Sequence, residues 1–400
     1  KHLDRARNQI ADALSEYECY NVVIDEVTRS MDLLMNIDQN RDYFVRQVRG
    51  TAAFLPLNQP LYAAVCFGCV PSLMAVNTWI RPPAAMHSTF KRLLPVARFV
   101  DFFPNVTVSF DDKAAFVRSC APAADAVIFT GTRKNGDDVR RQFPPGVLFM
   151  LNGAGHNPLV VTQSADLSHA VDSARRVVLQ NQGQDCAGPN SILVHSSIER
   201  EFLALLTSSL ESVKGRVGPY RDRRNIVGPN TDPDAPMQIA KHLDTLRELA
   251  PGSLVYGGEI NPMSGVIYPT VVRVPLRAKP PHSSLSGLEE WFAPIFYVQP
   301  YEHDDQLAWY FEHPLYREHA MYVSMFGESP YVRSLVARGL HTPESLLHNT
   351  DLHETEHGYL PYGGLGRSAS HIVVNGRLTA KPTLPQRDIY EHLVRPRLAH

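Results

Sequence analysis

The sequence predicts an α/β protein in which strands alternate with helices in two successive units. Short apolar stretches of strand length alternate with segments of helical periodicity after Gly50, and the same pattern repeats from Asn157 onward. This alternation implies parallel sheets that are covered by helices on both faces. With 400 residues, 44% of them hydrophobic, the chain is long enough for two or three domains.

A helical N-terminal segment precedes the first unit. Apolar residues recur at mostly helical spacing over 3–35, which predicts one or two helices. The expected order after Gly50 is strand 52–55, helix 61–75, strand 78–80, helix 88–97, strand 106–108, helix 113–118, strand 126–129 and helix 137–142.

The second unit repeats the alternation of strands and helices and is followed by segments without this alternation. Its expected order is strand 157–161, helix 168–181, strand 191–195, helix 199–212 and helix 234–248. A Pro-rich, irregular connection then occupies 261–282. The segment 371–387 mixes strand-forming residues with Pro382 and Pro385, which is typical of an extended edge strand.

The charge balance indicates no strong attraction to polyanions. Lys and Arg number 39 against 41 Asp and Glu, a net charge of −2, so no nucleic-acid partner is expected. The longest apolar tract, 61–76, is interrupted by Pro71 and is shorter than the ~20 residues of a membrane-spanning helix, so no membrane association is expected. Five scattered cysteines and the lack of a secretory signal predict a cytoplasmic protein.

The densest chemical signal is the segment 181–188, which reads NQGQDCAG. Cys186 lies here at the end of a predicted helix and between glycines, which let substrate and backbone approach a thiol closely. A nucleophilic Cys186 is expected to have a lowered thiol pKa, because the thiolate is the reactive form. On composition alone, a buried structural cysteine is the more common case.

Glycine-containing turns are further candidates for ligand contact. Thr130 and Gly131 close a predicted strand, and Gly136 follows before a helix, which suits phosphate contact at a helix N-terminus. A second small-residue turn over 153–155 precedes the strand at 157–161. Each turn alone is a weak signal, because such turns are common between strands and helices.

Two other motifs are better explained without metal or redox chemistry. Residues 353–357, HETEH, match the zinc motif HExxH, but Gly358 and Pro361 leave little room for the helix that this motif needs. Cys66 and Cys69 form a CxxC within an apolar predicted helix, where a packing role is expected. No metal site is therefore predicted.

Six segments, in this order, resemble motifs of the aldehyde dehydrogenase superfamily. Segments 56–61 and 129–136 resemble its P-W-N-x-P-L turn and its F-T-G-S-x-x-x-G cofactor turn. Segments 152–158 and 181–186 resemble E-L-G-G-K-N-P and N-x-G-Q-x-C. Segments 289–294 and 360–366 resemble E-E-x-F-G-P and L-P-F-G-G-x-G. The chain is identified as a divergent member of this superfamily.

The resemblance implies a Rossmann-like cofactor domain, an α/β catalytic domain and a C-terminal oligomerisation strand. It also implies NAD or NADP as the cofactor and a homo-oligomeric assembly. The corresponding divisions are a helical segment over 1–50, a nicotinamide cofactor-binding domain over 51–151, a catalytic domain over 152–362 and a tail with the oligomerisation strand over 363–400.

The resemblance further implies roles for individual residues. Cys186 takes the place of the nucleophile, and Asn58 takes that of the oxyanion-hole amide, together with the backbone N–H of Cys186. The implied cofactor residues are Thr130, Gly131 and Gly136 at the pyrophosphate turn, Arg81 in place of a lysine at the adenosine ribose, Glu290 at the nicotinamide ribose, and Phe292 in the motif of Glu290.

Three departures from the family pattern bear on the chemistry. Asn152 replaces the general-base glutamate, and an amide cannot take a proton from water. Ala84 replaces a ribose-binding glutamate, which removes a repulsion of the 2′-phosphate, so the cofactor preference is expected to lean to NADP or to be relaxed. The N-terminal region is also shorter than in the family. Strands of the cofactor domain, and a β-hairpin that in the family pairs with the C-terminal strand, are therefore expected to be missing or to lie outside this numbering.

Together these observations predict NAD(P)-dependent oxidation of an aldehyde through a thioacyl intermediate on Cys186. The expected partner is a small-molecule aldehyde or an acyl thioester. Because Asn152 is no base, the acyl group is alternatively passed to coenzyme A, or an acyl thioester is reduced in the reverse direction. A catalytically impaired pseudoenzyme that serves as a scaffold is the other alternative, against which the intact Cys186, Asn58 and Glu290 speak.

Overall fold

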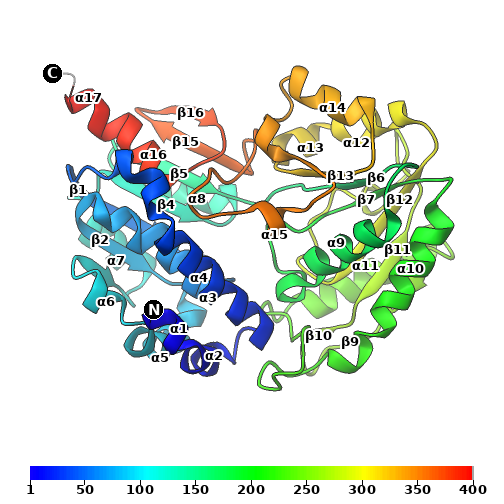
Figure 1. Cartoon of the computed structure of the whole chain (residues 1–400), viewed down its shortest axis with the longest axis horizontal. Helices are drawn as coiled ribbons and strands as arrows, with labels where there is room; N and C mark the ends of the chain where they lie inside the picture. The colour runs from blue at the N-terminus through cyan, green and yellow to red at the C-terminus, as the bar shows by residue number, and fades with distance from the viewer. Residues whose placement is uncertain (399–400) are drawn as a thin grey trace.

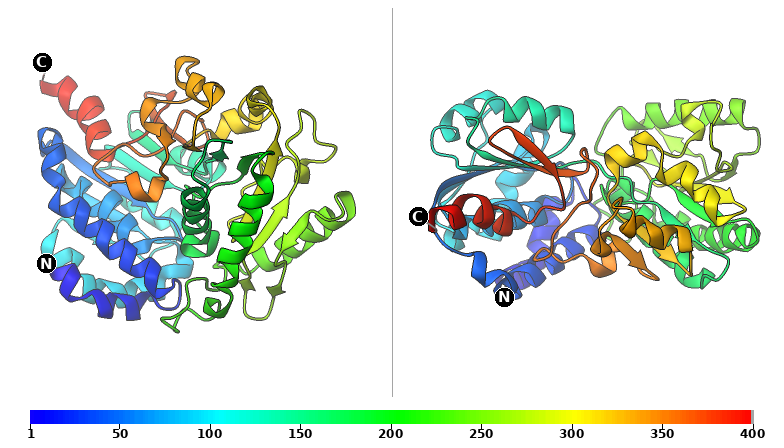
Figure 2. Two further views of the ribbon diagram at one scale, coloured as in Figure 1. Left: turned by 45° about the vertical axis from the view of Figure 1, so that its right-hand side comes forward. Right: turned by 90° about the horizontal axis from the view of Figure 1, so that it is seen from above.

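The structure, a computed structural model that describes residues 1–398, consists of two lobes, each built on a seven-stranded sheet (Figure 1). The first lobe contains the N-terminal and C-terminal segments of the described residues, and the second contains the middle of the chain. Figure 2 shows the lobes side by side, with the connecting segments between them. This architecture belongs to the α/β class that the sequence predicts.

Five parallel strands form the body of the first sheet. In spatial order they are β3 (Val106–Val108), β2 (Ala75–Arg81), β1 (Val48–Phe54), β4 (Ala126–Thr130) and β5 (Leu148–Asn152). This 3-2-1-4-5 order is that of a doubly wound sheet, whose ligands bind beyond the carboxyl ends of the strands where the order reverses. All five strands lie within residues 48–152, and the expectation of missing strands stays a prediction.

Helices cover both faces of this sheet, as the alternation of side chains along a strand requires. Val127 and Phe129 of β4 pack with residues of α7 and α8, whereas Ala126 and Ile128 face the opposite layer. The helices are α4 (Pro60–Ala64), α5 (His87–Ala97), α6 (Phe99–Phe102), α7 (Lys113–Cys120) and α8 (Arg133–Arg140). Among the described residues, no helix is long and apolar enough to cross a membrane.

The helix expected over 61–75 consists of three short turns. After α4 the chain continues as the π-helical η2 (Val65–Cys69) and then as the 3-10 turn η3 (Pro71–Leu73). Pro71 has no N–H to donate to a preceding carbonyl, which explains why the α-helix does not continue.

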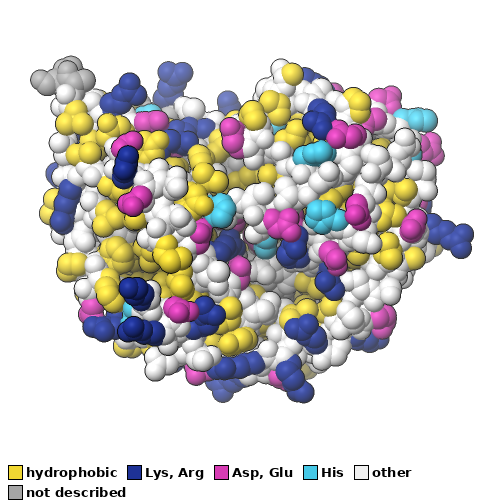
Figure 3. Space-filling model, in the orientation of Figure 1, with side chains coloured by type: hydrophobic (Ala, Val, Ile, Leu, Met, Phe, Trp, Pro, Cys, Tyr) yellow, Lys and Arg dark blue, Asp and Glu magenta, His cyan; other side chains and the backbone are white. Residues whose placement is uncertain are grey.

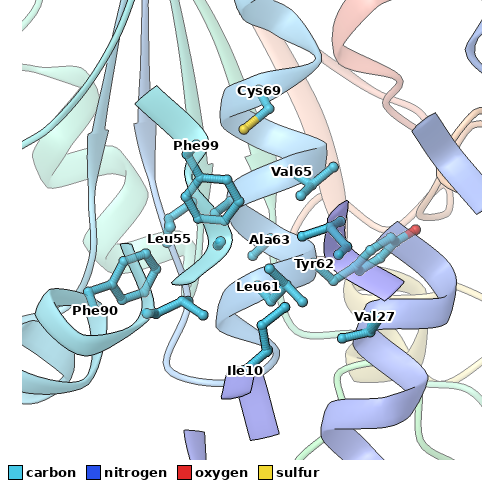
Figure 4. Close-up of a cluster of buried hydrophobic side chains, with 14 of the residues drawn as sticks. Ile10, Val27, Leu55, Leu61, Tyr62, Ala63, Val65, Cys69, Phe90 and Phe99 are labelled. Carbon is cyan, nitrogen blue, oxygen red and sulfur yellow. The ribbon is translucent and has the colours of Figure 1, made fainter. Parts of the chain in front are cut away.

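The N-terminal helices pack directly onto the first lobe. They are α1 (His2–Arg5), α2 (Arg7–Leu14) and α3 (Tyr20–Met35), followed by the 3-10 turn η1 (Ile37–Tyr43). Figure 4 shows Ile10 of α2 and Val27 of α3 beside Leu61 of α4, and all three side chains are fully buried. Burial of each such side chain stabilises this association by ~1.5–3 kcal/mol. The segment 1–50 therefore shares a hydrophobic core with the sheet that follows it.

The second sheet is parallel except at one edge. Its strands, in spatial order, are β14 (Leu346–His348), β13 (Val323–Phe326), β6 (Leu159–Val161), β7 (Ile192–His195), β12 (Ile295–Tyr301), β11 (Thr270–Arg273) and the antiparallel β8 (Leu254–Tyr256). The helices are α9 (Leu167–Leu179), α10 (Glu199–Glu211), α11 (Ala235–Leu249), α12 (Ala308–Phe311), α13 (Pro314–His319) and α14 (Pro330–Ala337). A two-stranded ribbon, β9 (Ile260–Asn261) with β10 (Val266–Ile267), lies in the connection expected to be irregular.

The C-terminal segment returns to the first lobe after α15 (Leu352–Thr355). Strand β15 (Ser370–Val374) pairs antiparallel with β5, and β16 (Arg377–Ala380) forms the outer edge of the sheet. The last helices are α16 (Pro385–Ile389), the π-helical η10 (Tyr390–Val394) and α17 (Arg395–Leu398). The tail thus extends the first sheet within the chain, and assembly of copies through it stays a prediction.

Candidate active site

A pocket between the two lobes contains the predicted nucleophile. It lies where the strand order of the first sheet reverses. It is lined by residues that follow β1, by the last residues of β4 and β5, and by Asp185 and Cys186 of the second lobe. The returning chain closes it with Tyr362 and Thr383. Figure 3 shows acidic, basic and histidine side chains gathered near α15, at the junction of the lobes.

Cys186 follows the tight turn η5 (Gln180–Gly183) at the end of α9. Asn181 and Gln182 have left-handed backbone conformations, with φ of 46° and 49°, so the chain reverses just before the thiol. A side chain on Gly183 would collide with the backbone of Ala293. Glycine is therefore required here for the close approach of two segments of the second lobe.

The half-buried side chain of Cys186 lies close to a tyrosine hydroxyl and near several carboxyl groups. Tyr362 Oη lies 2.9 Å from Sγ. Burial raises the pKa of the Cys186 thiol well above its ordinary value, Asp185 raises it further, and the hydrogen bond to Tyr362 lowers it. The expected lowering of this pKa is wrong, because burial disfavours the charged thiolate and because the charged groups that act on the sulfur are carboxylates.

Asn58 lies on the turn between β1 and α4 and lines the same pocket as Cys186. Its Nδ2 atom donates to the carbonyl oxygen of Gln184 over 3.0 Å. This bond connects the first lobe to the loop that carries the thiol and leaves the second amide hydrogen for a ligand. Asn58 is thus suited to donate to an oxyanion formed beside Cys186.

Two buried carboxyl groups hold the helix that follows Asn58. Glu18 Oε1 accepts a hydrogen bond from the N–H of Gln59 over 2.8 Å, and Glu26 Oε2 accepts one from the N–H of Tyr62 over 2.9 Å. The N–H groups at the start of a helix have no partner within it. Burial raises the pKa of Glu18 and, more strongly, that of Glu26, where the neighbouring Glu18 adds to the effect. No local motif in the sequence signals this pair.

Asn152, the residue in place of a general base, ends β5 and also lines the pocket. Its Oδ1 atom accepts a hydrogen bond from Thr383 Oγ1 over 2.6 Å. Among the described residues, its buried Nδ2 atom and the buried Oγ1 atom of Thr130 have no hydrogen-bond partner. Unpaired buried polar atoms are costly, so this part of the pocket fits a polar ligand such as the nicotinamide cofactor.

The other residues of the cofactor turn lie outside the lining of this pocket. Gly131 has φ of 144°, which favours glycine, and its N–H donates to the Asn152 carbonyl over 2.9 Å. A Cβ on Gly136 would lie 2.5 Å from Leu151 Cδ1, so this glycine lets α8 pack closely on β5. Arg81 ends β2 and donates from Nε to the Asp111 carbonyl over 3.2 Å.

Glu290 and Phe292 line an adjacent crevice that shares Asp185 with the main pocket. Burial, and then Asp185, raises the pKa of Glu290 well above its ordinary value. Phe292 has a left-handed backbone, with φ of 44°, and its carbonyl accepts a hydrogen bond from Asn230 over 2.7 Å. The structure therefore brings Cys186, Asn58, Asn152 and Thr130 together in one pocket and places Glu290 and Phe292 beside it.

The residues of the HExxH match diverge to different partners. Helix α15 has only four residues. His353 contacts the Asp185 carboxylate over 2.7 Å, whereas His357 contacts Asp32 over 2.8 Å and Glu356 accepts from Arg29 over 2.6 Å. Residues 353–357 therefore do not present two imidazoles on one helix face, as a zinc site on this motif requires.

The CxxC cysteines are both free but differ in position. Cys69 is fully buried in the core of the first lobe, whereas Cys66 lines the pocket that contains Cys186. Burial raises the pKa of the Cys66 thiol to about 12. The packing role expected for the pair is consistent with the position of Cys69, and Cys66 is an additional pocket residue that sequence reasoning did not assign.

Comparisons with known proteins indicate the family to which the chain is similar. The sequence pattern of the aldehyde dehydrogenase family matches residues 1–371. A hydroxyisobutyraldehyde dehydrogenase of Mycolicibacterium austroafricanum is 29% identical over 218 residues, which are 52% of this chain and 41% of that protein. An aminoaldehyde dehydrogenase of Arabidopsis thaliana is 25% identical over 319 residues, which are 76% of this chain and 62% of that protein. The chain thus spans less than two thirds of the length of these curated relatives.

Solved structures of similar fold cover more of the chain at lower identity. An oxidoreductase of Marinobacter aquaeolei has a TM-score of 0.78 at 18% identity, with 94% of this chain and 81% of that chain covered. A glyceraldehyde-3-phosphate dehydrogenase of Methanocaldococcus jannaschii, solved with NADP, has a TM-score of 0.75 at 18% identity, with 96% and 84% covered. Since the family pattern extends over residues 1–371, the chain belongs to the aldehyde dehydrogenase family.

Proposed function

We propose that this protein oxidises an aldehyde with NAD or NADP through a thioacyl intermediate on Cys186. One observation carries the proposal: the Cys186 sulfur and the Asn58 amide line a single pocket at the point where a doubly wound sheet reverses its strand order. Thr130 and Asn152 add unpartnered buried polar atoms on the side of that sheet. These are the groups that covalent aldehyde oxidation needs, a nucleophile, an oxyanion donor and a cofactor site.

The chain's own residues would act as follows. The Cys186 sulfur adds to the aldehyde carbon, and the carbonyl oxygen gains negative charge. The free hydrogen of Asn58 Nδ2 and the backbone N–H of Cys186 would hold that oxygen. The Thr130–Gly131 turn would hold a nicotinamide dinucleotide, which supplies the hydride acceptor for the oxidation.

We infer further that water is not the preferred acceptor of the acyl group. An amide at position 152 cannot take a proton from water, and Thr383 already binds its oxygen. Without a general base, hydrolysis of the thioester is expected to be slower by ~10²–10⁴-fold. A thiol acceptor such as coenzyme A needs no such base to enter as a thiolate, which supports the acylating reaction or its reverse, the reduction of an acyl thioester.

The decisive experiment follows cofactor reduction against a panel of aldehydes, with and without coenzyme A. Reduction that depends on Cys186, and that coenzyme A accelerates, is the expected result. Fast reduction without coenzyme A would reject the thiol acceptor but keep the thioacyl mechanism. Full activity of Cys186→Ala would reject the mechanism. Absence of cofactor binding and of turnover in all arms would favour a scaffold.

A further inference from the structure

The sulfur of Cys186 is in direct contact with a side chain that the family pattern does not provide. Tyr362 Oη lies 2.9 Å from Cys186 Sγ, although 176 residues separate the two in the chain. Tyr362 occupies the third position of the segment 360–366, where the family motif has phenylalanine. Tyrosine differs from phenylalanine by one hydroxyl group, and the oxygen of this hydroxyl is the atom that contacts the Cys186 sulfur.

Tyr362 is held firmly in this position. Its backbone N–H donates to the Thr383 carbonyl over 2.8 Å, and the Thr383 N–H donates back to the Tyr362 carbonyl over 2.8 Å. The next residue, Gly363, donates its N–H to the hydroxyl of Tyr322 over 3.0 Å. The returning chain thus fixes the phenol ring at the mouth of the thiol site, and little conformational entropy is lost when its hydroxyl forms a bond there.

The hydroxyl of Tyr362 acts on the pKa of the Cys186 thiol in the opposite direction to the other surroundings of the sulfur. Burial raises the pKa of the Cys186 thiol most, Asp185, Glu290 and Glu356 raise it further, and the Tyr362 hydrogen bond lowers it. Burial raises the pKa of Tyr362 itself well above its ordinary value, and negative charge on Cys186, Glu356 and Asp185 raises it further. The phenol therefore keeps its proton and can only act toward a thiolate as a hydrogen-bond donor.

We propose that Tyr362 is a catalytic residue whose hydroxyl donates a hydrogen bond to Cys186 Sγ and stabilises the sulfur as the attacking thiolate. The proposal rests on the proposed function in that Cys186 is taken as the nucleophile. It assigns to this chain a substitute for the cations or histidines that activate thiols elsewhere.

The step balances without an additional reactant. The thiol proton leaves to solvent water, and the Tyr362 proton stays on its own oxygen while the hydrogen bond to sulfur shortens. The thiolate lone pair then forms the C–S bond, and the carbonyl π pair moves to the aldehyde oxygen. As the charge leaves the sulfur, the Tyr362 hydroxyl is released from its bond to the thiolate.

The test is the rate of alkylation of Cys186 by iodoacetamide in the full chain, measured by peptide mass spectrometry between pH 7 and 11. Tyr362→Phe restores the family's residue and removes only the hydroxyl. Because a hydrogen bond to a charged group stabilises that group substantially, the rate of alkylation of Cys186 at pH 7 should fall about tenfold in Tyr362→Phe. The rate profile should shift to higher pH, which a purely structural role of the ring would not produce.

Two controls belong to this experiment. Cys66 lines the same pocket and should be alkylated at an unchanged rate in Tyr362→Phe. The ring of Tyr359, in the same loop, stacks on His357. Tyr359→Phe removes the hydroxyl of this tyrosine and should leave the alkylation rate of Cys186 unchanged. An unchanged alkylation rate of Cys186 in Tyr362→Phe would overturn the proposal.

A second measurement does not depend on the folding of the phenylalanine variant. Site-specific replacement of Tyr362 by fluorotyrosine makes the phenol a stronger donor, so alkylation of Cys186 should become faster, and slower or equal alkylation would contradict the proposal. Alkylation requires no turnover. If Cys186→Ala retained full activity, the proposed function would fail. The alkylation rates would still show whether the Tyr362 hydroxyl stabilises the Cys186 thiolate.

Discussion

Thr383 Oγ1 donates a 2.6 Å hydrogen bond to Asn152 Oδ1, although the two residues lie 231 positions apart. Asn152 ends the last parallel strand of the first sheet, and Thr383 belongs to the C-terminal segment that folds back over it. The bond orients the amide so that its Nδ2 atom remains unpartnered at the pocket. Asn152, which replaces the general base of the family, is therefore held as a hydrogen-bond donor toward the pocket.

We predict that Asn152→Glu raises steady-state hydrolysis of the acyl-enzyme by ~10²-fold or more, because it restores a general base. The wild type should show a burst of reduced cofactor about equal to the number of sites and then a slow phase. Stopped-flow absorbance measures both, and Asn152→Gln serves as the control that keeps an amide. Fast turnover of the wild type in water without a burst would contradict this prediction.

We predict that only Cys186, among the cysteines of the pocket, is needed for chemistry. Cys186→Ala should abolish cofactor reduction, whereas Cys66→Ala should retain it, because the loss of one half-buried sulfur atom only alters packing. Steady-state assays of the two variants, with thermal melting to verify folding, provide the comparison. Loss of activity in a well-folded Cys66→Ala would assign Cys66 a role beyond packing.

We predict that NADP binds about tenfold more tightly than NAD, since a guanidinium gains a charge-assisted hydrogen bond to a phosphate. Arg81 lies at the end of β2, and the exposed Ala84 begins the next turn, where a glutamate would repel the 2′-phosphate. Calorimetric titration with both cofactors measures the preference. Ala84→Glu should reverse it, and clearly tighter binding of NAD to the wild type would refute the argument.

We predict that stability decreases as the pH rises because of the buried pair Glu18 and Glu26. Both pKa values are raised in the folded state, so folding favours the protonated forms, and their contribution is complete at low pH and is lost as the pH rises through the folded-state pKa values. A glutamine at position 26 carries no charge at any pH. The substitution Glu26→Gln should therefore stabilise the protein at pH 8 by on the order of 1 kcal/mol.

Urea unfolding at pH 5 and pH 8 tests this effect. The exposed Glu344 provides the control, and Glu344→Gln should leave the pH dependence as it is in the wild type. Equal slopes of stability against pH in the wild type and Glu26→Gln would show that the carboxyl pair does not titrate in this range.

The parts of the fold that depend on local periodicity could be predicted from the sequence. The apolar run at 126–129 and the helical spacing at 168–181 correspond to β4 and α9 with shifts of at most two residues at their ends. The pocket residues Cys186 and Asn58 were also identified, because each belongs to a short motif.

The remaining features of the site arise from contacts between distant segments. No local pattern could bring the Tyr362 hydroxyl to Cys186 or Glu18 to the N–H of Gln59. The direction of the thiol pKa shift was wrong for the same reason. It depends first on burial of the thiol and then on Asp185, Glu290 and Glu356, of which only Asp185 is a sequence neighbour of the thiol.

The antiparallel pairing of β15 with β5 has a consequence for synthesis on the ribosome. Parallel strands β1 to β5 emerge early, but the edge of β5 stays uncovered until residue 370 has been translated, because Ser370 is the partner of Asn152. The whole middle lobe is made in the interval, and within it β6 waits for β13 and β7 waits for β12 before their open edges are paired. A nascent chain therefore presents an open sheet edge for most of its elongation, the kind of edge that other chains pair with and that chaperones shield.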